Sequence, residues 1–207
     1  MKRKNILLAA ILTILSISSS TAKSMREMWL AMPDSIVSTL NKNQRLELVE
    51  LLDMKVKAEV TNQLQGTSSL DSLSADYLKV TVSKCSTVEM KLLPGNDSLL
   101  CLIHTFMAPE KESEIKVYTR DWHMTDIEVN TDNMQLTANP DTMEQQQYDK
   151  LIKLIDPRMV NASFAPNSAD ICLALSLPLL GNDDKKEVAS ILLQRKLKWN
   201  GAKFNEY

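Results

Sequence analysis

The spacing of apolar residues near the start of the chain predicts a short helix or a pair of turns. Met25, Met28, Trp29 and Met32 recur at intervals of three and four, the period at which side chains share one face of a helix. Because methionine adapts to varied shapes, such a cluster could also form a partner surface. A helix packed onto a sheet is the preferred interpretation.

A longer helix is predicted to begin after Asn41. Asn41 and Gln44 have the spacing of a capping box. Apolar residues then keep a helical stripe as far as Val60, and Gly66 stands where a helix usually ends. Three carboxylates lie three residues apart on this helix, at Glu47, Glu50 and Asp53, and could be paired catalytic acids. Arg and Lys residues interleave with them, so a solvated charged face is the preferred interpretation.

The period of the apolar residues then changes from 3.6 to 2. Residues 67–76 are rich in Ser and have no period, so they are predicted to form a loop. Strands are predicted where apolar and polar residues alternate or an apolar run is bounded by turn residues, at 78–83, 88–92, 99–107 and 115–122. Short connections between these strands indicate an antiparallel meander.

A second round of elements follows. A helix is predicted to start at Asp141 or Thr142 and to end at Pro157. Strands are predicted at 160–164, 171–179 and 193–199, with a short helix near Asp184 and Glu187. Two stretches, 41–124 and 141–204, each place a helix before strands, then a strand with Cys and a strand ending in Trp. They are candidate halves of an internal repeat, with coincidence as the alternative.

These elements predict an α+β fold with one antiparallel sheet of about six to eight strands and helices on one face. The other face is expected to be polar and uncovered. The outward positions expected on it are Lys79, Thr81, Glu89, Lys91, Lys116 and Arg120.

Residues 1–22 have the pattern of an export signal. Lys2, Arg3 and Lys4 precede an apolar run at 6–17, and Ser20-Thr21-Ala22 is a small-residue cleavage site. The run is too short to span a bilayer as a helix. Cleavage after Ala22 leaves a single predicted α+β domain at 23–207, located in the periplasm or secreted, with no stable membrane anchor.

Charge and composition give little indication of a partner. Cleavage removes three of the 24 Lys and Arg residues and none of the 26 Asp and Glu residues, so the net charge of the mature chain becomes −5. That value gives no electrostatic reason to expect nucleic acid or an anionic membrane. A chain of this length also needs no metal or disulfide to bury a sufficient core.

The three cysteines, Cys85, Cys101 and Cys172, are an odd number in an oxidising compartment. At most one intramolecular disulfide can form, which leaves at least one free thiol. Cys101 and Cys172 lie in apolar runs, where Cys commonly packs as a small hydrophobic residue. No essential disulfide is expected.

Candidate metal and catalytic residues are few. Cys101 and His104 have the spacing of a metal half-site, but residues three apart on a strand point to opposite faces. With His123 as the other histidine, both imidazoles are expected to be structural or surface groups. The scattered glycines form no nucleophile elbow, phosphate loop or dinucleotide motif. We therefore expect a protein without cofactor, metal or enzymatic activity.

Four short motifs combine Asp with Ser or Thr and then an apolar residue. This pattern is similar to the O-glycosylation acceptor of exported proteins from Gram-negative gut anaerobes. The alternative is that Asp and Ser occur in caps and turns for backbone reasons. The acceptor positions would be Ser35, Ser72, Ser98 and Thr142.

Two segments carry a resemblance to a known family. The step Met32-Pro33-Asp34-Ser35 and the helix start Arg45-Leu46-Glu47-Leu48 resemble the opening of an uncharacterised exported family of Gram-negative gut anaerobes. This is a domain of unknown function, so the resemblance implies no catalytic or binding residues. The layout of helix and meander is also similar to β-lactamase-inhibitor-like proteins, by fold analogy alone.

The sequence favours an exported, non-enzymatic module that binds a protein or peptide of the cell envelope. It would use the uncovered sheet face or an exposed edge strand. The alternative is a small-ligand carrier, or a hydrolase with a dispersed active site, either of which needs a deep pocket. A purely structural envelope component is a third hypothesis.

Overall fold

The computed structural model describes residues 23–95, 99–131 and 134–207. The predicted export signal, its cleavage position Ala22 and the motif residue Ser98 lie outside these ranges. The helices of the described chain are α2 (Met25–Ala31), α3 (Lys42–Asp53), α4 (Gln145–Ile152) and α5 (Asn182–Ala189). None of them is long and apolar enough to cross a membrane.

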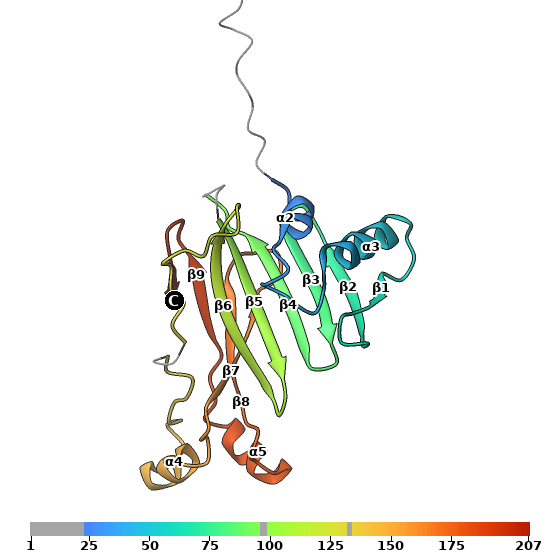
Figure 1. Cartoon of the computed structure of the whole chain (residues 1–207). Helices are drawn as coiled ribbons and strands as arrows, with labels where there is room; N and C mark the ends of the chain where they lie inside the picture. Colours follow the sequence, from blue (N-terminus) through green and yellow to red (C-terminus); the bar gives the residue numbers. More distant parts are fainter. Residues whose placement is uncertain (1–22, 96–98, 132–133) are drawn as a thin grey trace, which may run out of the picture.

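The strands form two antiparallel sheets, so the predicted α+β class and the meander are confirmed, whereas the single sheet is not (Figure 1). The larger sheet runs in chain order through β1 (Glu59–Thr61), β2 (Thr67–Leu73), β3 (Tyr77–Ser83), β4 (Ser86–Leu92), β5 (Leu99–Met107) and β6 (Lys111–Thr119). The smaller sheet has the order β10-β9-β8-β7 and consists of β7 (Met159–Phe164), β8 (Ile171–Ser176), β9 (Arg195–Trp199) and β10 (Phe204–Glu206).

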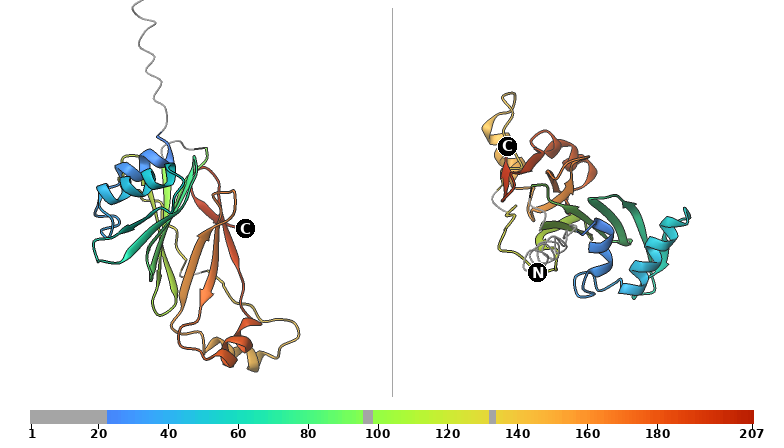
Figure 2. Two further views of the ribbon diagram at one scale, coloured as in Figure 1. Left: turned by 90° about the vertical axis from the view of Figure 1, so that its right-hand side faces the viewer. Right: turned by 90° about the horizontal axis from the view of Figure 1, so that it is seen from above.

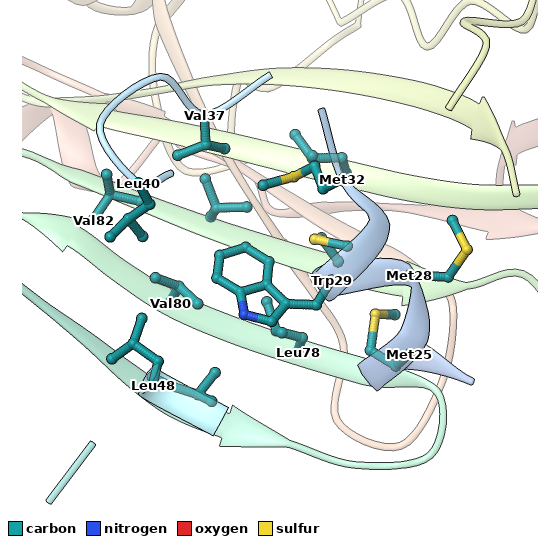
Figure 3. Packing of buried hydrophobic residues seen from close by; sticks show 14 of the residues in the cluster. Met25, Met28, Trp29, Met32, Val37, Leu40, Leu48, Leu78, Val80 and Val82 are labelled. Carbon is teal, nitrogen blue, oxygen red and sulfur yellow. The ribbon is translucent and has the colours of Figure 1, made fainter. Parts of the chain in front are cut away.

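Helices α2 and α3 cover one face of the larger sheet. The capping box predicted for α3 is present, since the Asn41 side chain accepts from the Gln44 N–H and the Gln44 side chain accepts from the Asn41 N–H, each at 3.0 Å. The methionines of the predicted cluster are buried around Trp29, which packs on β3 and its neighbours (Figure 3). This cluster is therefore core rather than a partner surface.

The smaller sheet covers part of the opposite face (Figure 2). Strand β7 packs against β6, β5 and β4. Cys101, Ile103 and Val117 of the larger sheet share a buried cluster with Ala162 and Leu173 of the smaller one. Strand β5 is thus apolar on both faces, which explains why a second sheet forms where one was predicted.

The predicted uncovered polar face is wrong in two respects. Glu89 and Lys91 are only 8% and 7% exposed, because β7 and the turn after it lie over β4. Lys116 and Arg120 lie on the helix-covered face instead, since Lys116 pairs with Leu102, which packs with α2 and α3. Lys79 and Thr81 lie on the expected face, where they are half-buried.

Three local predictions are also corrected. Helix α3 ends at Asp53, Val60 belongs to β1, and Gly66 lies in the turn to β2. The Ser-rich stretch predicted as a loop contains β2, whose outward polar residues hide its strand pattern because Ser68 and Leu70 alone are buried. Helix α4 begins at Gln145, so Asp141 and Thr142 lie in the preceding turn, and it ends before Pro157.

The two candidate halves have different connections. The first contains α3 and then β1 to β6 without interruption, whereas the second places α5 between β8 and β9. Trp199 ends β9 as predicted, but Trp122 lies in a turn beyond β6 with a φ of 64°. The internal repeat remains a prediction.

Candidate functional site

Strand β6 forms one edge of the larger sheet. It pairs with β5 along its whole length, from Lys111 opposite Met107 to Thr119 opposite Leu99. On its other side the chain turns back after Trp122, and the segment 124–131 runs beside β6 (Figure 1). We call this segment the strap.

The outer edge of β6 has backbone groups directed toward the strap. The Thr119 N–H donates to the His123 carbonyl, and the Thr125 N–H donates to the Val117 carbonyl, both at 2.9 Å. Residues 117 and 119 therefore direct their backbone groups away from β5. Because successive residues of a strand alternate, Ser113 and Ile115 must direct theirs the same way.

Most of these outward groups are unpaired within the described chain. The pairing of strap and β6 stops after Thr125, and no described residue bonds the backbone N–H or carbonyl of Ile115. At the far end, the Arg158 guanidinium donates to the Thr131 carbonyl at 3.4 Å. The strap is thus attached at both ends and separated from β6 between them.

A groove of about 500 Å³ occupies this separation, lined by residues 113–117 of β6 and by the strap. Its apolar lining consists of Ile115, Val117, Ile127 and Val129, with Met124 67% exposed at one end. Its charged residues are one cation and three anions, a formal charge of −2, provided by Lys116, Glu114, Asp126 and Glu128. The groove combines an apolar lining, an acidic border and free backbone groups.

Some charged residues of the groove form an ion pair with each other, and others do not. The Lys116 ammonium lies 2.7 Å from the Glu114 carboxylate, and this hydrogen bond raises the pKa of Lys116. Asp126 and Glu128 are exposed and form no ion pair with any described residue. The uncompensated negative charge therefore belongs to the strap.

The histidines do not line this groove. His123 is exposed in the turn before the strap, whereas His104 is half-buried on β5. The His104 Nε2 atom lies 2.7 Å from the Ser86 hydroxyl, and its ring packs on Phe106 with centroids 4.1 Å apart. Burial lowers the pKa of His104, which the nearby Lys116 also lowers and Glu114 raises.

The lowered pKa of His104 predicts a loss of stability in mild acid. The unfolded imidazole takes up a proton near its ordinary pKa of about 6.5, whereas the folded one resists protonation until a lower pH. The midpoint of thermal unfolding should therefore fall more between about pH 7.5 and 5 in the wild type than in His104→Gln. Equal decreases in the two proteins would show that His104 does not cause the effect.

The remaining candidate residues lie apart from one another. Cys85 is exposed, Cys101 is buried in β5 and Cys172 is half-buried in β8. The carboxylates Glu47, Glu50 and Asp53 are exposed, and Asp53 pairs with Arg26 at 2.9 Å. No group of three or more His, Cys, Asp and Glu side chains among the described residues could hold a metal ion.

The candidate glycosylation positions that the structure describes are all accessible. Ser35 lies in the turns after α2, Ser72 at the irregular register step of β2, and Thr142 in the turn before α4. All three are exposed, as either interpretation of the motif requires. The glycan therefore remains a prediction.

The prediction from sequence named an exposed edge strand but did not locate it. A usable signal exists in the strap, where Ile127, Val129 and Thr131 alternate with polar residues as in a strand. That pattern is typical of a half-buried strand, yet the strap pairs with β6 only at its start, where Met124 forms a bridge with Tyr118 and the Thr125 N–H donates to the Val117 carbonyl. An unpaired strand-like segment beside an unpaired edge marks the groove.

The fold and the groove define an α+β protein of two packed antiparallel sheets with an open edge strand. The sequence matches the family described as "Protein of unknown function (DUF3256)" over residues 17–204, and the chain belongs to that family. This confirms the resemblance to an uncharacterised family. No curated protein matches the sequence.

A solved structure shares the fold. It is described as "Structure of a domain of an uncharacterized protein from Porphyromonas gingivalis W83", and it is similar with a TM-score of 0.73 at 19% identity. The match covers 90% of this chain and 99% of that one. At this identity the likeness establishes the arrangement of helices and sheets and no activity.

Proposed function

We propose that this protein is an exported, non-enzymatic module that binds an extended polypeptide of the cell envelope by adding it as a strand to β6. The observation that carries the proposal is the row of outward backbone groups on β6 that faces the groove. In β-strand addition, such groups supply the affinity and alternate side-chain sites supply the specificity. The strap runs beside this edge and shields it from unspecific pairing, but it leaves the groove along the middle of β6 open.

The lining of the groove indicates which polypeptide would fit. An added strand presents alternate side chains to the two faces, so one set would meet the half-buried side chains of Ile115, Ile127 and Val129. The other set would lie near the acidic residues Asp126 and Glu128. A peptide that alternates apolar and basic residues matches both sets.

The same charges make a second copy of this chain a poor occupant. Pairing of β6 with β6 in a dimer would bring two grooves together, each with a formal charge of −2. Like charges across an interface oppose association. The negative charge of the groove attracts a basic partner, whereas it repels a second copy of this chain.

The test uses two synthetic probe peptides of about seven residues, a length that spans the groove. The basic probe is acetyl-Lys-Val-Lys-Ile-Lys-Val-Lys-amide, and the acidic control replaces every Lys with Glu. We expect calorimetry at low salt to detect binding of the basic probe and none of the acidic one. The double variant Asp126→Lys/Glu128→Lys should weaken the basic probe by about tenfold, since each surface pair contributes up to about 1 kcal/mol.

Two results would contradict the proposal. One is that neither probe binds, and the other is that both bind equally well and the double variant changes nothing. A matched control is Asp183→Lys/Glu187→Lys on α5, which reverses two exposed charges outside the groove. That control should leave the affinity for the basic probe within twofold.

A further inference from the structure

A second cavity of about 420 Å³ lies where the turn between β2 and β3 meets the turn between β7 and β8. The larger sheet contributes Tyr77, Asp76 and Lys91, and the smaller sheet contributes Phe164 and the turn after it. The cavity shares no lining residue with the groove along β6. It is therefore a separate candidate site.

Lys91 is the unusual residue of this cavity. Its side chain is 9% exposed, and its ammonium lies 2.9 Å from the Asp76 carboxylate and 5.8 Å from the centroid of the Tyr77 ring. Asp76 is its one hydrogen-bond partner among the described residues. An ammonium has three donors, so two of them are directed to no described acceptor.

The aromatic wall of the cavity is fixed in place by Glu89. The Tyr77 hydroxyl donates to Glu89 Oε2 at 3.1 Å, and the Phe164 backbone N–H donates to the same oxygen at 3.3 Å. The rings of Tyr77 and Phe164 meet edge to face with centroids 6.3 Å apart. Burial and the charge of Glu89 raise the pKa of Tyr77, so the phenol keeps the proton that it donates.

Polar groups complete the lining without adding net charge. The Ser72 hydroxyl and the Asn167 side chain line the cavity and bond no described residue. The Ser168 hydroxyl accepts from the Asp170 N–H and keeps its own hydrogen for another acceptor. The two charges of the lining, Lys91 and Asp76, neutralise each other, and the Lys91 hydrogen bond lowers the pKa of Asp76.

These features specify the chemistry of a ligand. An anion or a cation alone would have to compete with the existing pair of Lys91 and Asp76, whereas a neutral molecule would not. A ligand with several hydroxyl groups can accept from Lys91, donate to Asp76 and exchange hydrogen bonds with Ser72 and Asn167. Its C–H groups would lie on the aromatic wall, the mixture typical of sites that combine apolar surface with a few placed polar groups.

We propose that this cavity binds a neutral polyhydroxylated ligand of the class of a monosaccharide or a sugar unit of a glycan. The site is independent of peptide binding at β6. A ligand there would contact both sheets and bridge β4 to the turn after β7.

The test is a titration of the isotope-labelled protein followed by backbone amide NMR. The neutral probes are glucose, galactose, mannose and N-acetylglucosamine, and the charged probes are inorganic phosphate, an anion, and glycine, a zwitterion that carries one charge of each sign. We expect at least one sugar to shift the amides of Tyr77, Asn167 and Ser168 saturably at millimolar concentration, and neither charged probe to do so.

The matched variant is Asn167→Gly, because Asn167 has a φ of 59°, which glycine adopts without strain. Without the Asn167 side chain, the hydrogen bonds that it would form with the sugar are lost, which should weaken sugar binding about tenfold. Gln65→Gly is the control, since Gln65 has a φ of 61° in an exposed turn away from the cavity, and it should leave binding unchanged.

Three outcomes would overturn this proposal, the first two of which concern the wild-type protein. One is that no sugar produces saturable shifts at these amides, and the other is that phosphate or glycine binds there in place of the sugars. Sugar binding that is equally strong in Asn167→Gly and Gln65→Gly would also overturn it.

Discussion

Replacement of Arg45 with methionine is expected to lower the free energy of unfolding by about 2 to 4 kcal/mol, the cost of leaving buried polar groups without partners. Arg45 is 1% exposed because it lies on the face of α3 that packs toward the larger sheet. Urea unfolding followed by circular dichroism measures the difference directly.

The reason lies in what the Arg45 guanidinium bonds. It donates to the backbone carbonyls of Met32 and Leu40 and to the Asp34 carboxylate, and it lies 5.7 Å from the centroid of the Trp29 ring. These bonds satisfy the carbonyls of the turns that connect α2 to α3. Methionine fills similar space but donates no hydrogen bond, so both carbonyls would lose that partner.

Arg26→Met is the matched control. Arg26 forms an ion pair with Asp53, but the two side chains are 43% and 53% exposed. An exposed pair contributes at most about 1 kcal/mol because water solvates both partners when the pair is broken. Equal losses in Arg45→Met and Arg26→Met would contradict the assigned role of Arg45.

Replacement of Ile115 with proline is expected to weaken binding of the basic probe peptide by at least about tenfold. This is the effect expected when roughly one net hydrogen bond and its flanking contacts are lost. The Ile115 N–H points into the groove, so proline removes a donor to the peptide and no bond of the β5–β6 ladder. Proline is tolerated in edge strands at such positions. Calorimetry with the same probe measures the change.

Ile115→Val controls for the altered side chain. Valine keeps the backbone N–H and the β-branched shape, so its affinity for the probe should stay within about twofold of the wild type. The thermal unfolding midpoint of each variant shows whether the sheet is intact. A proline variant that folds and binds as well as the valine variant would show that the β6 edge is not the docking strand.

The helical part of the fold was largely accessible from sequence because its signals are local. The capping box of Asn41 and Gln44 involves residues three apart, and the structure contains it as predicted. The alternation in β3 likewise places Leu78, Val80 and Val82 in the core. Strand β2 was missed because its inward residues include Ser68, which is fully buried and bonded to Val82 and so gives no apolar signal.

The second sheet could not be predicted from local periodicity. Its position depends on which side chains of the larger sheet it meets, such as Ser113, whose hydroxyl accepts from the Ala162 N–H at 2.9 Å. That contact joins residues far apart in sequence. One signal was available, because the apolar run from Leu99 to Ile103 indicates a strand buried on both faces.

The sequence predicted the kind of candidate site but not its position in the fold. An exposed edge strand was expected, but its location at β6 depends on where the meander ends and on how the strap runs. The alternation of Ile127 and Val129 predicts a strand, and only the structure reveals that this segment is separated from β6. The cavity around Lys91 depends on the turn after Phe164 reaching β4, which is again a long-range contact.

The most direct test of peptide binding at β6 is an N-methyl scan of the basic probe. Each derivative carries one N-methyl group, which removes a single backbone donor and leaves every side chain in place. Because a strand directs successive N–H groups to opposite sides, we predict that affinity falls at every second position and is retained at the positions between. A scan in which all positions tolerate the methyl group, or all lose affinity equally, would contradict strand addition to β6.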